Sequence, residues 1–150
     1  MELLLWRHAE AEDGLPDFAR ALTAKGHKQA GKVATWLDRN LPGNCRVLVS
    51  PAQRAQQTAA ALGRKFKTVA ALAPGASAEE LLRQSGWPQA RESVLLVGHQ
   101  PALGQVAARL LGLPQEDCAI KKGAVWWFSN REREPGSHTV LRAVIAPDLL

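Results

Sequence analysis

Three short apolar runs in this 150-residue chain stop at polar residues and are each followed by helix-forming sequence. They are residues 2–7, 46–49 and 93–97, and continuous apolar runs of this length are typical of strands buried on both faces. Strands that alternate with helices predict an α/β fold with a mostly parallel central sheet. The expected architecture is therefore a three-layer α/β/α sandwich.

The helices expected between these strands follow from capping residues and from apolar residues at helical spacing. Thr23 is a candidate N-cap for a helix that ends before Pro42 and Gly43. Pro51 suits the first position of a second helix, which ends near Phe66. Ser77 is expected to cap a third helix at 77–82, and a fourth is expected at about 101–111.

The remaining segments predict short strands at the edges of the sheet. Residues 68–72 are a candidate third strand, and residues 120–128 and 138–145 read as two strands around a loop at 129–137. That last pair resembles a hairpin, which would give the sheet an antiparallel edge. The chain contains no repeat or linker, so residues 1–150 are expected to form a single domain.

The charge balance favours an anionic partner but does not choose among them. There are 19 Lys and Arg residues against 14 Asp and Glu residues, for a net charge of +5. Trp126 and Trp127 are not interleaved with a stripe of basic residues, so nucleic acid is not the expected partner. The four histidines lack the spacing of metal ligands, so neither a metal nor a cofactor is expected.

Two further features bear on location. Cys45 and Cys118 have no CxxC spacing, which favours ordinary thiols in a reducing compartment. The apolar start of the chain runs into Arg7 and His8, lacks a basic region before it, and is too short to cross a membrane. We expect a cytoplasmic protein without membrane association.

Polar residues at the carboxyl ends of the predicted strands are the candidate functional residues. Arg7 and His8 follow the first strand, Arg54 follows the second, and His99 follows the later one. In such sheets, ligands bind beyond these strand ends. An arginine fork can bind two phosphoryl oxygens, and a neutral imidazole can accept a phosphoryl group covalently. His8 or His99 would serve as acceptor, and the other would donate a hydrogen bond.

Each of these motifs alone is also compatible with a solvent-facing strand end, a helix start or a turn. Their joint occurrence after three strands favours a site for phosphoryl transfer. The pattern also resembles a known family. Residues 7–10 (R-H-A-E) resemble the R-H-G signature of the histidine phosphatase, or phosphoglycerate mutase-like, superfamily. Further matches in the family's order are L-T-x-x-G-x-x-Q-A at 22–30, S-P-x-x-R-A-x-Q-T-A at 50–59 and V-G-H-x-P at 97–101.

The resemblance covers residues 3 to about 111 and is greatest to the SixA phosphohistidine phosphatases. It implies a phosphoglycerate mutase-like fold in which His8 is the nucleophile and Arg7, Arg54 and His99 complete the phosphate pocket, without a metal. One departure is Ala9, which stands where the family usually has glycine, and its methyl group is expected to crowd the pocket slightly or shift the backbone.

The segment between Leu72 and Ser93 is short, so the resemblance implies a domain without the large cap insertion of bigger family members. No motif fixes the general acid. Glu10 and Asp17 are the candidates in the carboxylate-rich loop after His8.

Three functions are compatible with these residues. The first is hydrolysis of phosphohistidine on a protein, such as a histidine phosphotransfer domain, which would make the chain a hydrolase of signal transduction. The second is a phosphatase or mutase acting on a small phosphomonoester. The third is a phosphate-binding module without turnover, which is disfavoured because Arg7, His8, Arg54 and His99 are all present.

Overall fold

The computed structural model describes residues 1–133 and 136–150 and is built on one six-stranded sheet. The strands are β1 (Glu2–Arg7), β2 (Arg46–Val49), β3 (Lys67–Thr68), β4 (Val94–Gly98), β5 (Val125–Arg133) and β6 (Gly136–Ile145). Their order is β3-β2-β4-β1-β5-β6. The first four strands pair in parallel, whereas β5 and β6 form an antiparallel edge, as predicted.

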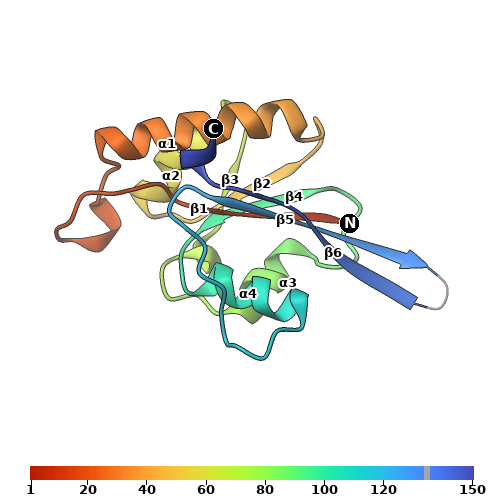
Figure 1. Cartoon of the computed structure of the whole chain (residues 1–150). Helices are drawn as coiled ribbons and strands as arrows, with labels where there is room; N and C mark the ends of the chain where they lie inside the picture. Colours follow the sequence, from red (N-terminus) through yellow and green to blue (C-terminus); the bar gives the residue numbers. More distant parts are fainter. Residues whose placement is uncertain (134–135) are drawn as a thin grey trace.

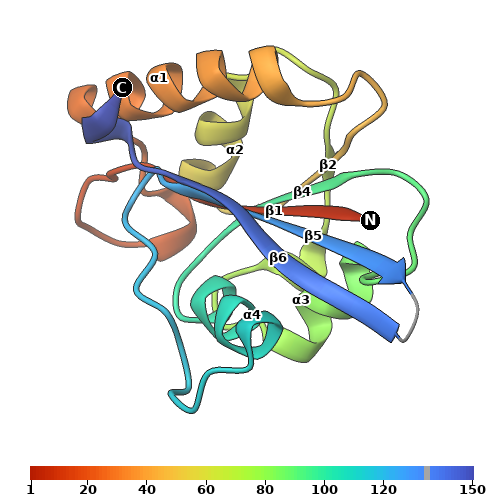
Figure 2. The ribbon, with the colours of Figure 1, turned by 45° about the vertical axis from the view of Figure 1, so that its right-hand side comes forward.

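Helices cover both faces of the sheet (Figure 1). They are α1 (Ala24–Asn40), α2 (Gln53–Ala60), α3 (Ala78–Ser85) and α4 (Ala102–Leu111), with short 3-10 helices η1 (Asp17–Ala19), η2 (Ala70–Leu72) and η3 (Pro147–Leu149). Figure 2 shows α1 and α2 on one face and α3 and α4 on the other, with the C-terminal η3 beside α1. The three-layer sandwich is therefore confirmed. Within residues 1–133 and 136–150, no helix has the length and apolar character needed to span a membrane.

Alternate residues of the strands feed two separate cores. In β1, Leu3 and Leu5 pack toward α3 and α4, whereas Leu4 and Trp6 pack toward α1 and α2. All four are fully buried. Because successive strand residues point to opposite faces, a strand buried on both sides must be apolar at every position. This explains why the run at residues 3–6 shows no alternation of polar and apolar residues.

Two predicted N-caps are confirmed. Thr23 Oγ1 accepts a hydrogen bond from the Gly26 N–H over 2.9 Å at the start of α1. Ser77 Oγ accepts from the Glu80 N–H over 3.1 Å at the start of α3. Each cap satisfies a main-chain donor that would otherwise lack a partner in the first helical turn.

The second helix is shorter than predicted at both ends. It begins at Gln53 rather than Pro51, because Ser50 Oγ accepts from the Ala52 N–H and holds these residues in a turn. It ends at Ala60 rather than near Phe66, and Gly63 follows with a φ of +71°. That left-handed conformation suits glycine and interrupts the helix.

The prediction of a strand at 68–72 is wrong beyond Thr68. The chain turns into η2, in which the Leu72 N–H bonds to the Val69 carbonyl and the buried Leu72 side chain joins the core beside α3. At the antiparallel edge, β5 begins at Val125 rather than at residue 120, because Gly123 makes a turn with a φ of +76°.

The loop predicted at 129–137 is largely strand. Ser129 pairs with Val140, and the ladder continues to Arg133 and Gly136. Residues 134–135 lie outside the described residues. The segment is polar, and for that reason the sequence predicts a loop. A hairpin that extends past the body of the sheet can be polar, because main-chain hydrogen bonds pair its strands without a buried apolar face.

Candidate active site

The two histidines of the motifs meet because β1 and β4 are parallel neighbours. Arg7 is in register with Gly98, and the His8 N–H donates to the Gly98 carbonyl over 3.1 Å. His8 and His99 therefore leave adjacent strands at the same edge. Their ring centroids lie 5.2 Å apart, and both side chains are buried. The predicted convergence of the motif histidines at one edge is confirmed.

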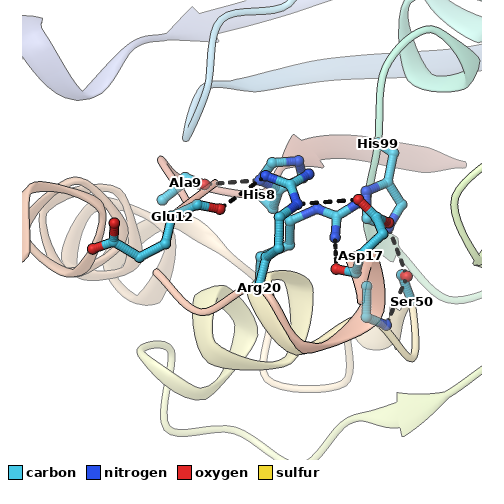
Figure 3. A network of polar contacts seen from close by, with 9 residues as sticks. His8, Ala9, Glu12, Asp17, Arg20, Ser50 and His99 are labelled. Atoms are coloured by element: carbon cyan, nitrogen blue, oxygen red, sulfur yellow. Dashed lines mark hydrogen bonds and ion pairs between the residues drawn. The ribbon is translucent and has the colours of Figure 1, made fainter. Parts of the chain in front are cut away.

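His8 is held in one tautomer by the chain that follows it. Its Nδ1 lies 2.8 Å from the Ala9 carbonyl oxygen (Figure 3). A carbonyl oxygen only accepts, so Nδ1 carries the proton and Nε2 keeps its lone pair. Burial lowers the pKa of His8 to about 4; the bond to Ala9 opposes this shift, and the charges of Arg54 and Arg7 add to it. At neutral pH the ring is therefore uncharged, which is the state that the predicted role as nucleophile requires.

His99 is oriented by Ser50, which follows β2. His99 Nε2 lies 2.7 Å from Ser50 Oγ, which also accepts from the Ala52 N–H (Figure 3). When the hydroxyl donates this hydrogen bond to the lone pair of Nε2, the ring carries its own proton on Nδ1. That Nδ1 is buried and has no hydrogen-bond partner among the described residues. Burial, and then the neighbouring His8 and Arg54, lower the pKa of His99 to about 3.

Arg54 lies in the first turn of α2 and is only 4% exposed. Its Nη1 donates to the Asp17 main-chain carbonyl over 2.9 Å, and its Nη2 donates to Asp17 Oδ2 over 3.1 Å. Its Nε is buried without a partner among the described residues. The guanidinium thus presents a planar set of donors next to the two histidines, and Asp17 covers part of it.

Arg7, which directly precedes His8, is anchored by a main-chain carbonyl. Its Nη1 donates to the Ile120 carbonyl over 2.9 Å, while its Nε is buried and unpartnered among residues that the structure describes. Burial lowers the pKa of Arg7, but an arginine stays protonated in any accessible pH range. Arg7 and Arg54 therefore both place fixed positive charge near the imidazole rings.

Arg20 is a third arginine at the site, and it is not among the residues predicted from the sequence. Its Nε donates to Asp17 Oδ1 and its Nη1 donates to the Glu12 carbonyl, each over 3.1 Å (Figure 3). Its charge also lowers the pKa of His8. Arg20 lies in a loop and not at a strand end. The only sequence signal for it is its position three residues after the candidate acid Asp17.

The two candidate acids differ in their surroundings. Glu10 Oε2 accepts from Thr23 Oγ1 over 2.8 Å, which ties it to the start of α1. Asp17 lies against Arg54. Burial would raise the pKa of Asp17, but hydrogen bonds from Arg54 and Arg20 outweigh it and lower that pKa. Asp17 is therefore ionised at neutral pH, which makes it a poor proton donor.

Side chains from the matched motifs hold the loop after His8 in place. The Ala9 N–H donates to Thr58 Oγ1 over 3.0 Å, and the Glu10 N–H donates to Gln29 Oε1 over 3.0 Å. The Ala9 methyl group, expected to crowd the pocket, is fully buried in a small apolar cluster with Leu22 and Ala30. The methyl therefore has a packing partner of its own.

Comparisons with known proteins point to one family. The family model described as histidine phosphatase superfamily, branch 1, matches residues 3–76. A phosphohistidine phosphatase SixA homolog of Haemophilus influenzae is 34% identical over 132 residues, covering 75% of this chain and 78% of that protein.

Solved structures share the fold along almost the whole chain. The protein histidine phosphatase SixA complexed with tungstate has a TM-score of 0.77 at 25% identity and is covered over 99% of both chains. A phosphoserine phosphatase from Entamoeba histolytica has a TM-score of 0.70 at 18% identity, with 97% of this chain and 96% of that chain covered. These matches show that the chain belongs to the histidine phosphatase superfamily and is similar to the SixA phosphatases.

Proposed function

We propose that this phosphatase hydrolyses phosphohistidine on a protein through a covalent intermediate on His8. The observation that carries the proposal is the hydrogen bond from His8 Nδ1–H to the Ala9 carbonyl, which leaves Nε2 as the free nucleophile. The same bond stabilises the positive charge that the ring acquires when Nε2 is phosphorylated. Membership in the superfamily supports phosphatase activity; the substrate and the residue roles are our proposal.

The reaction has two displacements at phosphorus. In the first, the bond from phosphorus to His8 Nε2 forms as the bond to the substrate's imidazole nitrogen breaks, and that nitrogen takes up a proton from solvent water. In the second, water attacks phosphorus and the bond to Nε2 breaks, which releases inorganic phosphate. Arg7, Arg54 and the Nδ1–H of His99 would hold the phosphoryl oxygens while charge builds on them.

The state of Asp17 favours a phosphoramidate over an alkyl ester. A positioned general acid typically contributes about 10²–10⁴-fold when the leaving group is a poor one such as an alkoxide. Asp17 is ionised by its contacts with Arg54 and Arg20, so it cannot donate that proton readily. The nitrogen of phosphohistidine is basic enough to take its proton without such a donor. Between Thr68 and β4 the structure contains only η2 and α3, which leaves a folded protein room to present a side chain.

Measurements on the wild-type chain and on two variants test this function. Rapid quench with a ³²P-labelled phosphohistidine peptide is expected to trap an acid-labile, base-stable phosphoryl group on the wild-type protein. His8→Ala should lack it and lose activity by orders of magnitude, whereas the exposed His27→Ala should behave as wild type. An active His8→Ala would overturn the assignment.

A substrate panel tests the substrate class. We expect the highest kcat/KM on the phosphohistidine peptide, an intermediate value on an aryl phosphate and the lowest on an alkyl phosphate or a phosphoserine peptide. A sugar phosphate or phosphoserine as the best substrate would contradict the proposed class while leaving the His8 chemistry standing.

We also propose catalysis without a metal, because three arginines already supply positive charge at the site. Activity should survive EDTA, and vanadate should inhibit as a mimic of five-coordinate phosphorus. Loss of activity on chelation, with recovery on adding a divalent cation, would show otherwise.

A further inference from the structure

A groove lined by lysines begins at Arg7 and runs along α1. Its volume is about 680 Å³, and its cations are Arg7, Lys25, Lys28, Lys32, Lys121 and Lys122. We call this surface the lysine groove. All five lysines are exposed. Apart from Arg7, none of these cations takes part in the proposed chemistry.

The two walls of the groove are fixed relative to the nucleophile. Lys25, Lys28 and Lys32 are spaced by three and four residues, so they lie on one face of α1 and span roughly 10 Å along its axis. On the other wall, Lys122 precedes Gly123, whose N–H bonds to the carbonyls of both Arg7 and His8 over 3.1 Å. A partner in the groove would therefore lie next to the phosphoryl site.

Carboxylates among the described residues do not neutralise the positive charge of the groove. None of its five lysines lies within 4.0 Å of a carboxylate oxygen in the part of the chain that the structure describes. Two carboxylates, Glu10 and Asp148, line the groove against six cations. Such an excess of unpaired charge attracts and orients an acidic partner.

The lining favours a protein over other polyanions. A nucleic acid strand would use aromatic side chains for stacking, and the groove has none. Its continuous phosphates would also meet Glu10 and Asp148. A compact polyphosphate would need converging donors, whereas the α1 lysines are spread over two helical turns. Carboxylates spaced along a polypeptide can contact the lysines and leave gaps at the two acids.

We propose that the lysine groove docks an acidic segment next to the phosphohistidine of the protein substrate. This inference rests on the proposed function and adds the partner's chemistry to it. The charge contacts would act mainly on KM, since they lie outside the reacting atoms and are made equally in the ground and transition states.

The test compares phosphohistidine peptides that differ only in their flanks, which are glutamates, serines or lysines. For the wild-type chain we expect kcat/KM to be about tenfold higher with glutamate than with serine flanks, and lowest with lysine flanks. The preference should shrink as salt is raised. In the double variant Lys28→Glu/Lys32→Glu, the preference for glutamate flanks should disappear or reverse, and the change should be in KM. Hydrolysis of an aryl phosphate by this variant should stay unchanged.

The matched control is Lys65→Glu/Lys67→Glu, which makes the same change in net charge at two exposed lysines outside the groove. It should keep the wild-type preference. Equal kcat/KM for all flanks in the wild type, or equal losses in both double variants, would overturn the docking proposal without touching the His8 chemistry.

A binding measurement separates failure of the groove from failure of the proposed substrate. Fluorescence anisotropy with the glutamate-flanked peptide carrying unphosphorylated histidine should show binding that Lys28→Glu/Lys32→Glu weakens about tenfold. The same binding and the same weakening are expected even if the protein hydrolyses no phosphohistidine peptide. Tighter binding of oligothymidylate or inorganic tripolyphosphate, lost in the same variant, would show that a protein is not the occupant.

Discussion

Arg54 contacts Asp17 at two points, through Nη1 to the main-chain carbonyl and through Nη2 to the carboxylate. The proposed function reserves the same guanidinium for the phosphoryl oxygens. A bound phosphoryl group and the Asp17 carboxylate therefore compete for one set of donors. Because η1 carries Asp17 on an exposed loop, the carboxylate can move at a small cost, whereas the buried Arg54 cannot.

Asp17→Asn should strengthen anion binding, because it removes the competing charge from Arg54. We expect the inhibition constants of inorganic phosphate and vanadate to fall several-fold, while turnover of a phosphohistidine peptide stays within about threefold of wild type. Steady-state inhibition measures this, with Asp13→Asn in the same loop as control. If turnover instead fell about a hundredfold or more, the size expected for loss of a general acid, Asp17 would be the proton donor.

Arg54→Lys should not behave as a conservative change. Lysine keeps the positive charge but loses the planar fork that contacts two oxygens at once. We expect catalytic efficiency to fall about a hundredfold, the size typical for removal of one preorganised donor, with an unchanged circular dichroism spectrum. Arg83→Lys, at an exposed position on α3, should be neutral. Wild-type turnover by the Arg54 variant would mean that this side chain does not touch the phosphoryl group.

The residues that could be predicted from the sequence stand at strand ends. The order and buried character of β1, β2 and β4 follow from local pattern, and parallel pairing brings whatever follows each strand to one edge. Arg7, His8, Arg54 and His99 were identified for that reason.

The contacts that orient those residues could not be predicted in the same way. Ser50 directly precedes the predicted helix start at Pro51, and nothing in the local pattern indicates that its hydroxyl contacts His99. Arg20 and Asp17 reach the site through a loop whose path depends on main-chain N–H groups that donate to Gln29 Oε1 and Gln57 Oε1, on two different helices. Such contacts join residues distant in sequence, so no local periodicity reports them.

The buried neutral histidines should make the folded state sensitive to acid. The pKa of His8 is about 4 and that of His99 about 3, both below the 6.5 of an exposed histidine. Between pH 6.5 and 4, the unfolded chain therefore binds more protons than the folded one, so stability falls as the pH falls. Each histidine contributes a slope of up to about 1.4 kcal/mol per pH unit in that range.

Urea unfolding at pH 7.0, 6.0, 5.0 and 4.5 measures this slope. His99→Gln should lower the slope by the share of one histidine, whereas exposed His27→Gln should leave it unchanged. A wild-type free energy of unfolding that stays constant from pH 6.5 to 4.5 would contradict the lowered pKa values.

Two glycines of α1 should respond to alanine in opposite directions. A Cβ at Gly26 would lie 2.0 Å from the Glu10 main-chain oxygen, which also accepts from the Thr23 N–H. At Gly31 the same Cβ would meet nothing within 4 Å. Gly31→Ala should therefore stabilise the protein by about 0.5–1 kcal/mol, since alanine loses less backbone entropy in a helix. Gly26→Ala should destabilise it by about 1–3 kcal/mol, the usual cost of overpacking.

Glu10 follows His8 by two residues, so moving its carbonyl should also lower kcat/KM, which Gly31→Ala should leave intact. Urea unfolding and aryl phosphate turnover measure both effects. If both variants shifted stability in the same direction, the close approach of α1 to the loop after His8 would not be what requires glycine at residue 26.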